Sequence, residues 1–349
     1  MIWVTWRQFR GTILLGVLAP LLLATAIAAV TFLADRLGSN YVLFRCFGLS
    51  TTTCLTESSL TLASLATIAL PVVLGVFVGV TAFSRDIERR THVLGLTQAV
   101  GRMQWYWTRV LVVFTPIVLA MVVLGYVVLW SRFGTSPFGS SFVDAFYSRL
   151  EFPTFGTIGV VPAGYTALGL AIGSSAALLL RNTIGAMVVT MVATVAVIVV
   201  FPGLVREHYA TPEVDRLTLD QSESGQSVAY EMDPSDVQRP SWTVDSLYVD
   251  AEGKRVDLAY DACSTVDDWP DPGPLETTSD FDNRVDAFMA DQSRARIECL
   301  RVQGADHYEN LLFDDRMLWR FQFTEAALCL LLSFSLAGGS TLAVRRLRP

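Results

Sequence analysis

The sequence predicts an α-helical integral membrane protein with six transmembrane helices and a mixed α/β extracytoplasmic domain between the fifth and the sixth. The 349 residues are 52% hydrophobic and 17% charged, with a mean hydropathy of +0.44, whereas soluble domains carry about 25% charged residues. The charges are also unevenly placed, because residues 206–320 hold 26 Asp and Glu against 11 Lys and Arg. These observations exclude a soluble enzyme, a nucleic-acid binder and a disordered chain.

The six predicted spans are apolar windows that carry almost no charge. A helix rises about 1.5 Å per residue, so about 20 residues cross a hydrocarbon core of about 30 Å. The fourth span is the weakest, because Gly and Ser dilute it. The spans lie at 11–33, 60–83, 110–130, 156–180, 184–204 and 321–344.

Three domains follow from these spans. Residues 1–204 hold the first five spans, an N-terminal interfacial helix over 1–10 and a cytoplasmic loop over 84–109. Residues 205–320 form the acidic extracytoplasmic domain. Residues 321–349 hold the sixth span and a basic cytoplasmic tail.

The placement of arginine predicts the orientation. If the N-terminus is cytoplasmic, the inside segments carry eleven arginines and the short outside loops carry four. Cytoplasmic loops are enriched in Lys and Arg, so both termini are expected in the cytoplasm and the acidic domain outside. The eleven are Arg7, Arg10, Arg85, Arg89, Arg90, Arg102, Arg109, Arg181, Arg345, Arg346 and Arg348.

The cysteines agree with this orientation. Cys46, Cys54, Cys263 and Cys299 fall on the oxidising side, where disulfides form. Four cysteines allow three pairings, of which we favour Cys46–Cys54 and Cys263–Cys299. Cys329, inside the last span, is expected to be a small apolar residue.

The acidic domain is expected to mix strands with one helix. Period-2 alternation predicts strands, the Pro, Gly and Asp content of 266–280 predicts a loop, and an apolar stripe after Phe281 predicts a helix that ends near Gly304. The strand candidates are 227–232, 241–249 and 256–261, and residues 142–150 are expected to form a membrane-surface helix.

The sequence lacks the motifs of several enzyme classes. A P-loop needs a lysine before Ser or Thr, and the single lysine, Lys254, is followed by Arg255. His92, His208 and His307 are far apart and have no metal-ligand spacing. We therefore expect no catalytic residue, no metal site and no cofactor on this chain.

The spans contain one ionisable residue, Glu325. Its carboxylate is either satisfied by Arg320, Arg316 or another helix, or it faces a translocation path. Two Gly-x-x-x-Gly pairs also allow close helix approach, either inside the bundle or at a seam between two copies. These glycines are Gly75, Gly79, Gly169 and Gly173.

The segment that joins spans two and three is the most specific. Ser84 can cap a helix that has Asp86 in its first turn, and Leu94 and Leu96 offer an apolar contact. A short charged helix of this kind suits a cytoplasmic partner. The alternative is an anchor loop without a partner.

This segment resembles the first cytoplasmic loop of ABC-2-type permeases, the membrane subunits of ATP-binding-cassette exporters, and especially an actinobacterial group. The group pattern is Arg-x-x-Glu-x-x-Thr-His-x-Leu-x-x-Thr-Gln, and MIWVTWRQFR, GTIGVVPAGYTALGLAIG and WRFQFTEAALCLLLSFSLAGG resemble its N-terminus, fourth span and last span. Arg89, Arg90 and Leu96 depart from the pattern. The matching residues are Arg85, Glu88, Thr91, His92, Leu94, Thr97 and Gln98.

The resemblance implies a type-2 ABC exporter permease in a bacterial plasma membrane, with a loop over residues 84–100 that contains its coupling helix. A separate ATPase subunit, which binds the ATP and Mg, would drive it, and a second permease copy, identical or different, would complete it. The substrate would be an amphipathic or hydrophobic drug, peptide or lipid. The residues expected to contact the ATPase are Arg85, Asp86, Glu88, Arg89, Arg90, Thr91, His92, Leu94 and Leu96.

Two other functions stay open at this point. The chain could be a membrane-anchored extracytoplasmic binding or sensing protein in which nothing crosses the membrane. It could also be a membrane enzyme that uses carboxylates of residues 206–320, which would require acidic residues clustered around a cleft.

Overall fold

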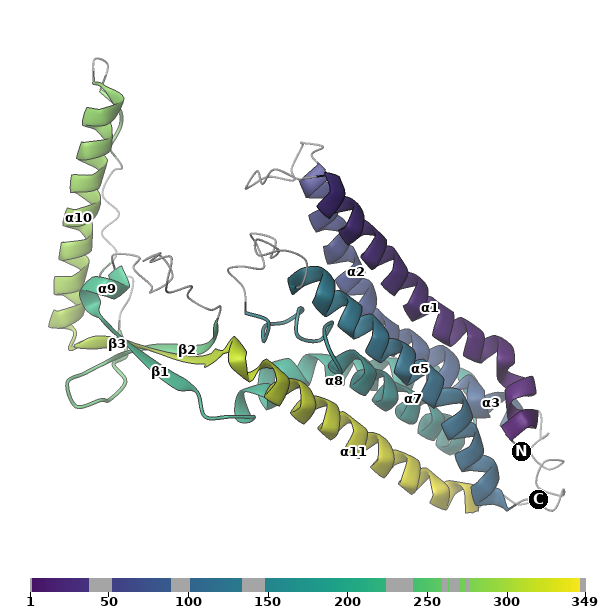
Figure 1. Cartoon of the computed structure of the whole chain (residues 1–349). Helices are drawn as coiled ribbons and strands as arrows, with labels where there is room; N and C mark the ends of the chain where they lie inside the picture. The colour runs from purple at the N-terminus through teal and green to yellow at the C-terminus, as the bar shows by residue number, and fades with distance from the viewer. Residues whose placement is uncertain are drawn as a thin grey trace. The chain divides into compact units, whose positions relative to one another are not determined.

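A computed structural model describes the chain in two compact units, Met1–Ala210 with Arg316–Pro349, and Thr211–Asp315 (Figure 1). We call them the membrane unit and the acidic unit. The described residues are 2–37, 52–88, 101–133, 148–223, 241–258, 263, 270–273 and 276–345.

The membrane unit is a bundle of long helices, and six helices of the described residues are long and apolar enough to cross a membrane. The second and fifth each contain a π turn, at Gly75–Gly79 and Phe201–Val205, and continue beyond it to Ser84 and His208. The helices are α1 (Ile2–Leu37), α2 (Thr52–Leu74), α3 (Thr81–Glu88), α5 (Arg102–Phe133), α7 (Val161–Leu180), α8 (Thr183–Val200) and α11 (Leu318–Arg345).

Three predicted boundaries in this unit are wrong. Residues 2–10 are the first turns of α1 rather than a separate helix, because the helix continues without a break through Gly11 into the span. The fourth helix begins at Val161 rather than at 156, because residues 151–160 form turns in which Gly159 has a φ of 63°. Ser84 lies inside α3 and does not cap it.

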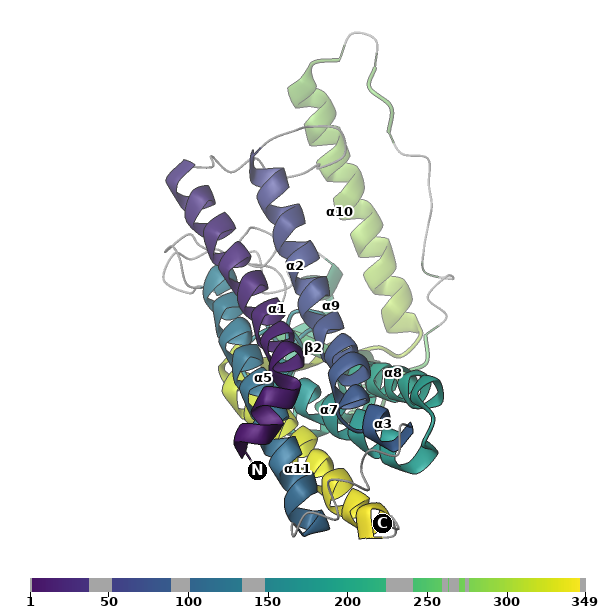
Figure 2. The same cartoon turned by 90° about the vertical axis from the view of Figure 1, so that its right-hand side faces the viewer.

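The centre of the membrane unit is α7, which contacts α2, α5, α8 and α11 (Figure 2). Seventeen of its residues are buried, and many of these are Gly, Ala or Ser. The small residues that make this span the least apolar therefore also make it the central one, because they let neighbouring backbones approach closely.

The two glycine motifs pack against each other inside the chain. A Cβ at Gly75 would lie 2.8 Å from the carbonyl oxygen of Gly169, and one at Gly79 would lie 2.9 Å from that of Leu170. A Cβ at Gly173 would meet the carbonyl oxygen of Gly75. These four glycines therefore join the end of α2 to α7 within one copy.

The acidic unit is a small three-stranded antiparallel sheet with one long helix. The strand order is β1-β3-β2, with β1 at Glu213–Thr218, β2 at Ser241–Val249 and β3 at His307–Asp314. A short helix, α9, spans Leu219–Glu223, and the long helix, α10, spans Thr278–Val302. The apolar core under the helices consists of Leu219, Cys263, Ile297, Leu300 and Ala305.

The expected helix near 281–304 and the strand over 241–249 are both present. The strand expected over 256–261 is wrong for its described part, because residues 256–258 are irregular after a turn with Gly253 at a φ of 82°. Candidate 227–232 and residues 142–147 lie outside the described residues. The unit also begins and ends about five residues inside the predicted 205–320, since residues 206–210 and 316–320 belong to the membrane unit.

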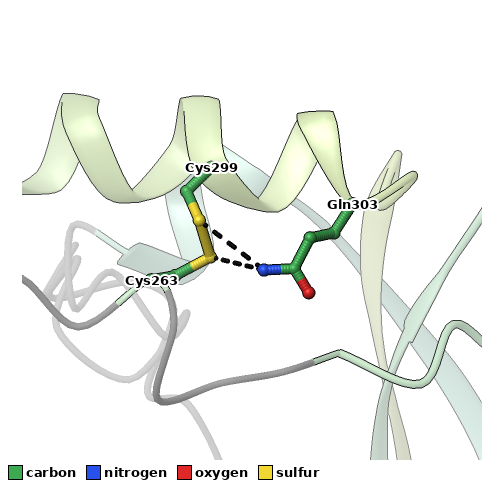
Figure 3. The surroundings of a disulfide bond; sticks show 3 residues. All are labelled: Cys263, Cys299 and Gln303. Atoms are coloured by element: carbon green, nitrogen blue, oxygen red, sulfur yellow. Dashed lines mark hydrogen bonds between the residues drawn. A yellow bond between two sulfur atoms is a disulfide. The ribbon is translucent and has the colours of Figure 1, made fainter.

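Cys263 and Cys299 form a disulfide that ties α10 to the loop before it, and the side-chain amide of Gln303 donates to Cys263 Sγ at 2.8 Å (Figure 3). Cys46 lies outside the described residues, so the pairing of Cys46 with Cys54 stays a prediction. Cys329 is a buried free thiol in α11.

Candidate functional site

A charge pair is buried in the membrane unit between the end of the fifth span and α11. Arg206, 1% exposed, donates two hydrogen bonds to the carboxylate of Glu325, 0% exposed, each at 3.1 Å. The hydroxyl of Tyr165, on α7, donates to the same carboxylate. Three helices therefore meet at one carboxylate.

Arg206 is also satisfied on its other side. Its Nη1 donates to the carbonyl oxygen of Leu150 at 2.9 Å, and its guanidinium carbon lies 3.9 Å from the centre of the Phe155 ring. A buried arginine needs such partners, because burial removes its hydration.

The structure shows which of the expected partners Glu325 has. Its carboxylate is bound from another helix, by Arg206 of the fifth span, rather than by Arg320 or Arg316. The fifth span does not end at 204 but continues through turns to His208, which brings Arg206 to α11. Glu325 is enclosed by protein and does not face an open path in this structure.

Irregular backbone is buried beside this charge pair. Residues 155–159 lie in turns, yet all are buried. Gln322 binds this backbone: its Oε1 accepts from the N–H groups of Val160 and Val161, and its Nε2 donates to the carbonyl oxygen of Phe155, all at 3.1 to 3.2 Å. Backbone groups at membrane depth must find partners within the protein.

Gln322 and Glu325 lie on one face of α11, three residues apart. Together they hold the segment 148–160 and the end of the fifth span against α11. We call this set of contacts the α11 clamp; it consists of Gln322, Glu325, Arg206, Tyr165 and the backbone of 148–161. Hydrophobicity alone could not reveal the clamp, although Glu325 within an apolar span pointed to it.

The predicted ATPase-contacting residues begin at the end of α3. Arg85, Asp86 and Glu88 are part of this helix, but the structure does not describe their side chains. The remaining six lie outside the described residues: Arg89, Arg90, Thr91, His92, Leu94 and Leu96.

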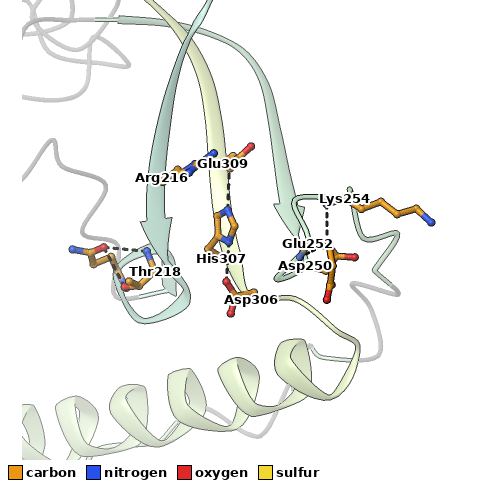
Figure 4. Close-up of polar contacts among 9 residues, drawn as sticks. Arg216, Thr218, Asp250, Glu252, Lys254, Asp306, His307 and Glu309 are labelled. Atoms are coloured by element: carbon orange, nitrogen blue, oxygen red, sulfur yellow. Dashed lines mark hydrogen bonds and ion pairs between the residues drawn. The ribbon is translucent and has the colours of Figure 1, made fainter.

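The acidic unit holds a second polar cluster, at the ends of its three strands (Figure 4). His307 contacts Asp306 at 3.0 Å and Glu309 at 3.3 Å, and Arg216 bonds Glu309 at 2.8 Å. The hydrogen bond with Asp306 raises the pKa of His307 above its ordinary value. Burial opposes ionisation of Glu309, but hydrogen bonds from His307 and Arg216 outweigh it and hold the pKa of Glu309 below its ordinary value.

A cavity of about 590 Å³ opens near this cluster, and its lining mixes Lys254, Arg255 and Arg301 with Asp250 and Asp306. Arg255 and Arg301 already pair with other carboxylates at 3.5 Å. Within the described ranges, no group of three His, Cys, Asp or Glu residues could hold a metal ion.

A comparison with protein families decides the identity of the membrane unit. A family model described as ABC-2 membrane transporter related matches residues 12–206, which is more than half of the chain. The chain belongs to this family. No curated protein and no solved structure matches it.

Membership confirms the resemblance found in the sequence. An ABC-2 permease is a membrane transport component rather than a catalytic one, and together with six apolar helices it identifies a multi-pass plasma membrane protein. The ABC-2 match begins in α1 and ends at Arg206, so it includes Tyr165 and Arg206 of the clamp and leaves out the acidic unit and α11.

Proposed function

We propose that this chain is the permease subunit of an ATP-binding-cassette exporter that moves an amphipathic or hydrophobic drug, peptide or lipid out across the plasma membrane. The family match over residues 12–206 carries this proposal. The sequence supplies no P-loop, because its one lysine, Lys254, is followed by Arg255. The energy for transport therefore comes from ATP and Mg bound by a separate ATPase subunit.

The ATPase binds the chain through residues 84–100. The helical run from Thr52 to Glu88, which includes the π turn Gly75–Gly79, leads directly into this segment. The run packs on α7 through the glycine contacts of Gly75 and Gly79. A displacement of its end therefore acts on a run that contacts the centre of the bundle.

Asp86, Glu88, Arg89, Arg90 and His92 supply the charged contacts with the ATPase, and Arg85 and Thr91 flank them. Leu94 and Leu96 seat the segment in an apolar groove of that subunit. Both termini lie in the cytoplasm and the acidic unit lies outside. The arginine count supports this orientation, because the segments that it puts inside carry eleven arginines and the short outside loops carry four. A second permease copy, identical or different, completes the transporter.

The test is to co-express the tagged full chain with an ATP-binding-cassette ATPase taken from the genes next to its own, which we call the neighbouring ATPase. ATP hydrolysis per ATPase subunit is then measured in the purified complex with and without orthovanadate. The wild-type complex should hydrolyse ATP in a vanadate-sensitive manner. Glu88→Lys should insert normally but lose bound ATPase and hydrolysis, because it reverses a charge at the contact. A matched control is Glu213→Lys, the same change at an exposed position of β1. Equal hydrolysis and equal bound ATPase in wild type and Glu88→Lys would refute the coupling assignment.

A further inference from the structure

Helix α3 ends at the same end of the membrane unit at which α1 and α5 begin (Figure 1). An arginine of α5 is buried there among aromatic rings. Arg109, on α5, is only 6% exposed. Its Nη1 donates to the carbonyl oxygen of Ala82, in α3, at 3.0 Å. Its guanidinium carbon lies 4.3 Å from the ring centre of Trp105, 5.1 Å from that of Phe9 and 6.0 Å from that of Phe83.

These contacts join three helices through one side chain. Phe9 belongs to α1, Ala82 and Phe83 to α3, and Trp105 to α5. Phe83 and Trp105 also touch edge to face, with ring centres 5.7 Å apart. We call the set Arg109, Phe9, Phe83 and Trp105 the aromatic cage.

Anchoring at the membrane surface does not account for this geometry. An anchoring arginine keeps its charged head in water, as Arg7 does on α1, where it is exposed and lies 5.3 Å from the Trp3 ring. Arg109 instead gives up most of its hydration, and the three rings and the carbonyl group are among the contacts that replace it.

The helix that Arg109 holds is attached to its neighbour by a weak joint. Helix α3 has only eight residues, and it follows the π turn Gly75–Gly79, in which Val80 N–H bonds to the carbonyl oxygen of Gly75 at 3.2 Å. A π turn with a glycine at each end is a place where a helix can bend. Helix α3 packs on α7 and α8, and Arg109 adds a contact that joins it to α1 and α5.

We propose that Arg109 is the positioning residue that transmits displacement of α3 to α1 and α5. The inference rests on the proposed function, in which an ATPase pushes on the segment after α3. Arg109 does not touch the ATPase or the substrate. It makes α3 move together with α1 and α5, the helices that carry Phe9 and Trp105. A displacement of α3 is then transmitted to these two helices instead of bending the chain at the π turn.

The first test measures hydrogen exchange of the full chain in lipid nanodiscs, without any ATPase. Arg109→Gln removes a hydrogen bond from a charged donor, so exchange over Thr81–Glu88 should become about tenfold faster or more, with little change in α8. Arg109→Lys keeps a charge but loses the planar stacking, and its effect should be intermediate. Arg7→Gln is the matched control and should leave exchange over α3 unchanged.

The second test uses the complex with the neighbouring ATPase. ATP with vanadate should change exchange in α3 and in the first turns of α1 and α5 of the wild-type chain. In Arg109→Gln the change in hydrogen exchange should be confined to α3, and the ATPase should still bind.

Two results would overturn the inference: unchanged exchange of α3 in Arg109→Gln, or faster exchange in all six helices, which would make Arg109 a general support of the fold. If the first test succeeds but no ATPase binds the wild-type chain, the proposed function fails and the transmission role fails with it. Faster α3 exchange with a bound ATPase, and an ATP response that still reaches α1 and α5, would contradict the inference alone.

Discussion

The membrane unit and the acidic unit each contain a bidentate arginine–carboxylate pair, in very different surroundings. In the membrane unit, Arg206 and Glu325 are almost completely buried. In the acidic unit, Arg284 bonds Glu276 at 2.7 and 2.9 Å, but the two side chains are 46% and 17% exposed. The bonds are similar in number and length. We therefore expect burial, rather than bond geometry, to decide how much each pair contributes to the free energy of unfolding.

The largest effect should come from breaking the buried pair. Glu325→Gln leaves the charge of Arg206 buried without its counter-ion, which costs about 3–5 kcal/mol of unfolding free energy in comparable sites. Thermal denaturation of the full chain in detergent measures this loss. The double variant Arg206→Met with Glu325→Leu should recover part of it, since no buried charge is then left. A single variant as stable as wild type would show that the clamp does not hold the bundle.

An intermediate effect should come from the disulfide of the acidic unit. Cys263 and Cys299 are 36 residues apart, and removal of a cross-link of this kind costs about 2–4 kcal/mol. Cys299→Ser should lower the unfolding temperature of this unit within the full chain, as followed by calorimetry. Reduction of the wild type with dithiothreitol should reproduce the shift. If neither treatment changes the transition, the bond is absent from the mature protein.

The smallest effect should come from the exposed pair. The hydrogen bond from Arg284, with a second from the Gly273 N–H, lowers the pKa of Glu276 from 4.5 to about 2. A carboxyl group with a lowered pKa contributes stability that is fully present above 4.5 and is lost as the pH falls towards 2. Arg284→Gln should therefore be slightly less stable than wild type at pH 7, and the two should converge near pH 2. A difference in unfolding temperature that persists at pH 2 would argue that Arg284 acts by packing, against Phe281, rather than by charge.

The sequence predicted the parts of the fold that depend on composition. The six apolar windows correctly predicted the six candidate spanning helices of the described residues, and the alternation of apolar and polar residues predicted the strand Ser241–Val249. The strands Glu213–Thr218 and His307–Asp314 were missed, because their charged residues interrupt the alternation and their pairing joins segments about ninety residues apart. Local pattern cannot supply such long-range partners.

The candidate sites show the same limit. The sequence singled out Glu325 because a carboxylate in an apolar span is costly, yet it could not name Arg206, since that choice depends on where the fifth span ends. From the sequence, Arg109 was only one of the eleven arginines expected in the cytoplasmic segments. Its contacts with Phe9 and Ala82 come from residues far away in the chain, so the residues next to Arg109 do not indicate them.

Photo-crosslinking shows whether an ATPase binds this permease through the segment after α3. A photo-crosslinking amino acid replaces His92 in one full-length variant and Glu213 in another, and each is irradiated in native membranes that contain the neighbouring ATPase. We expect a crosslink to the ATPase from position 92 and none from position 213. A crosslink from position 213, or none from position 92 while the ATPase co-purifies with the chain, would contradict it.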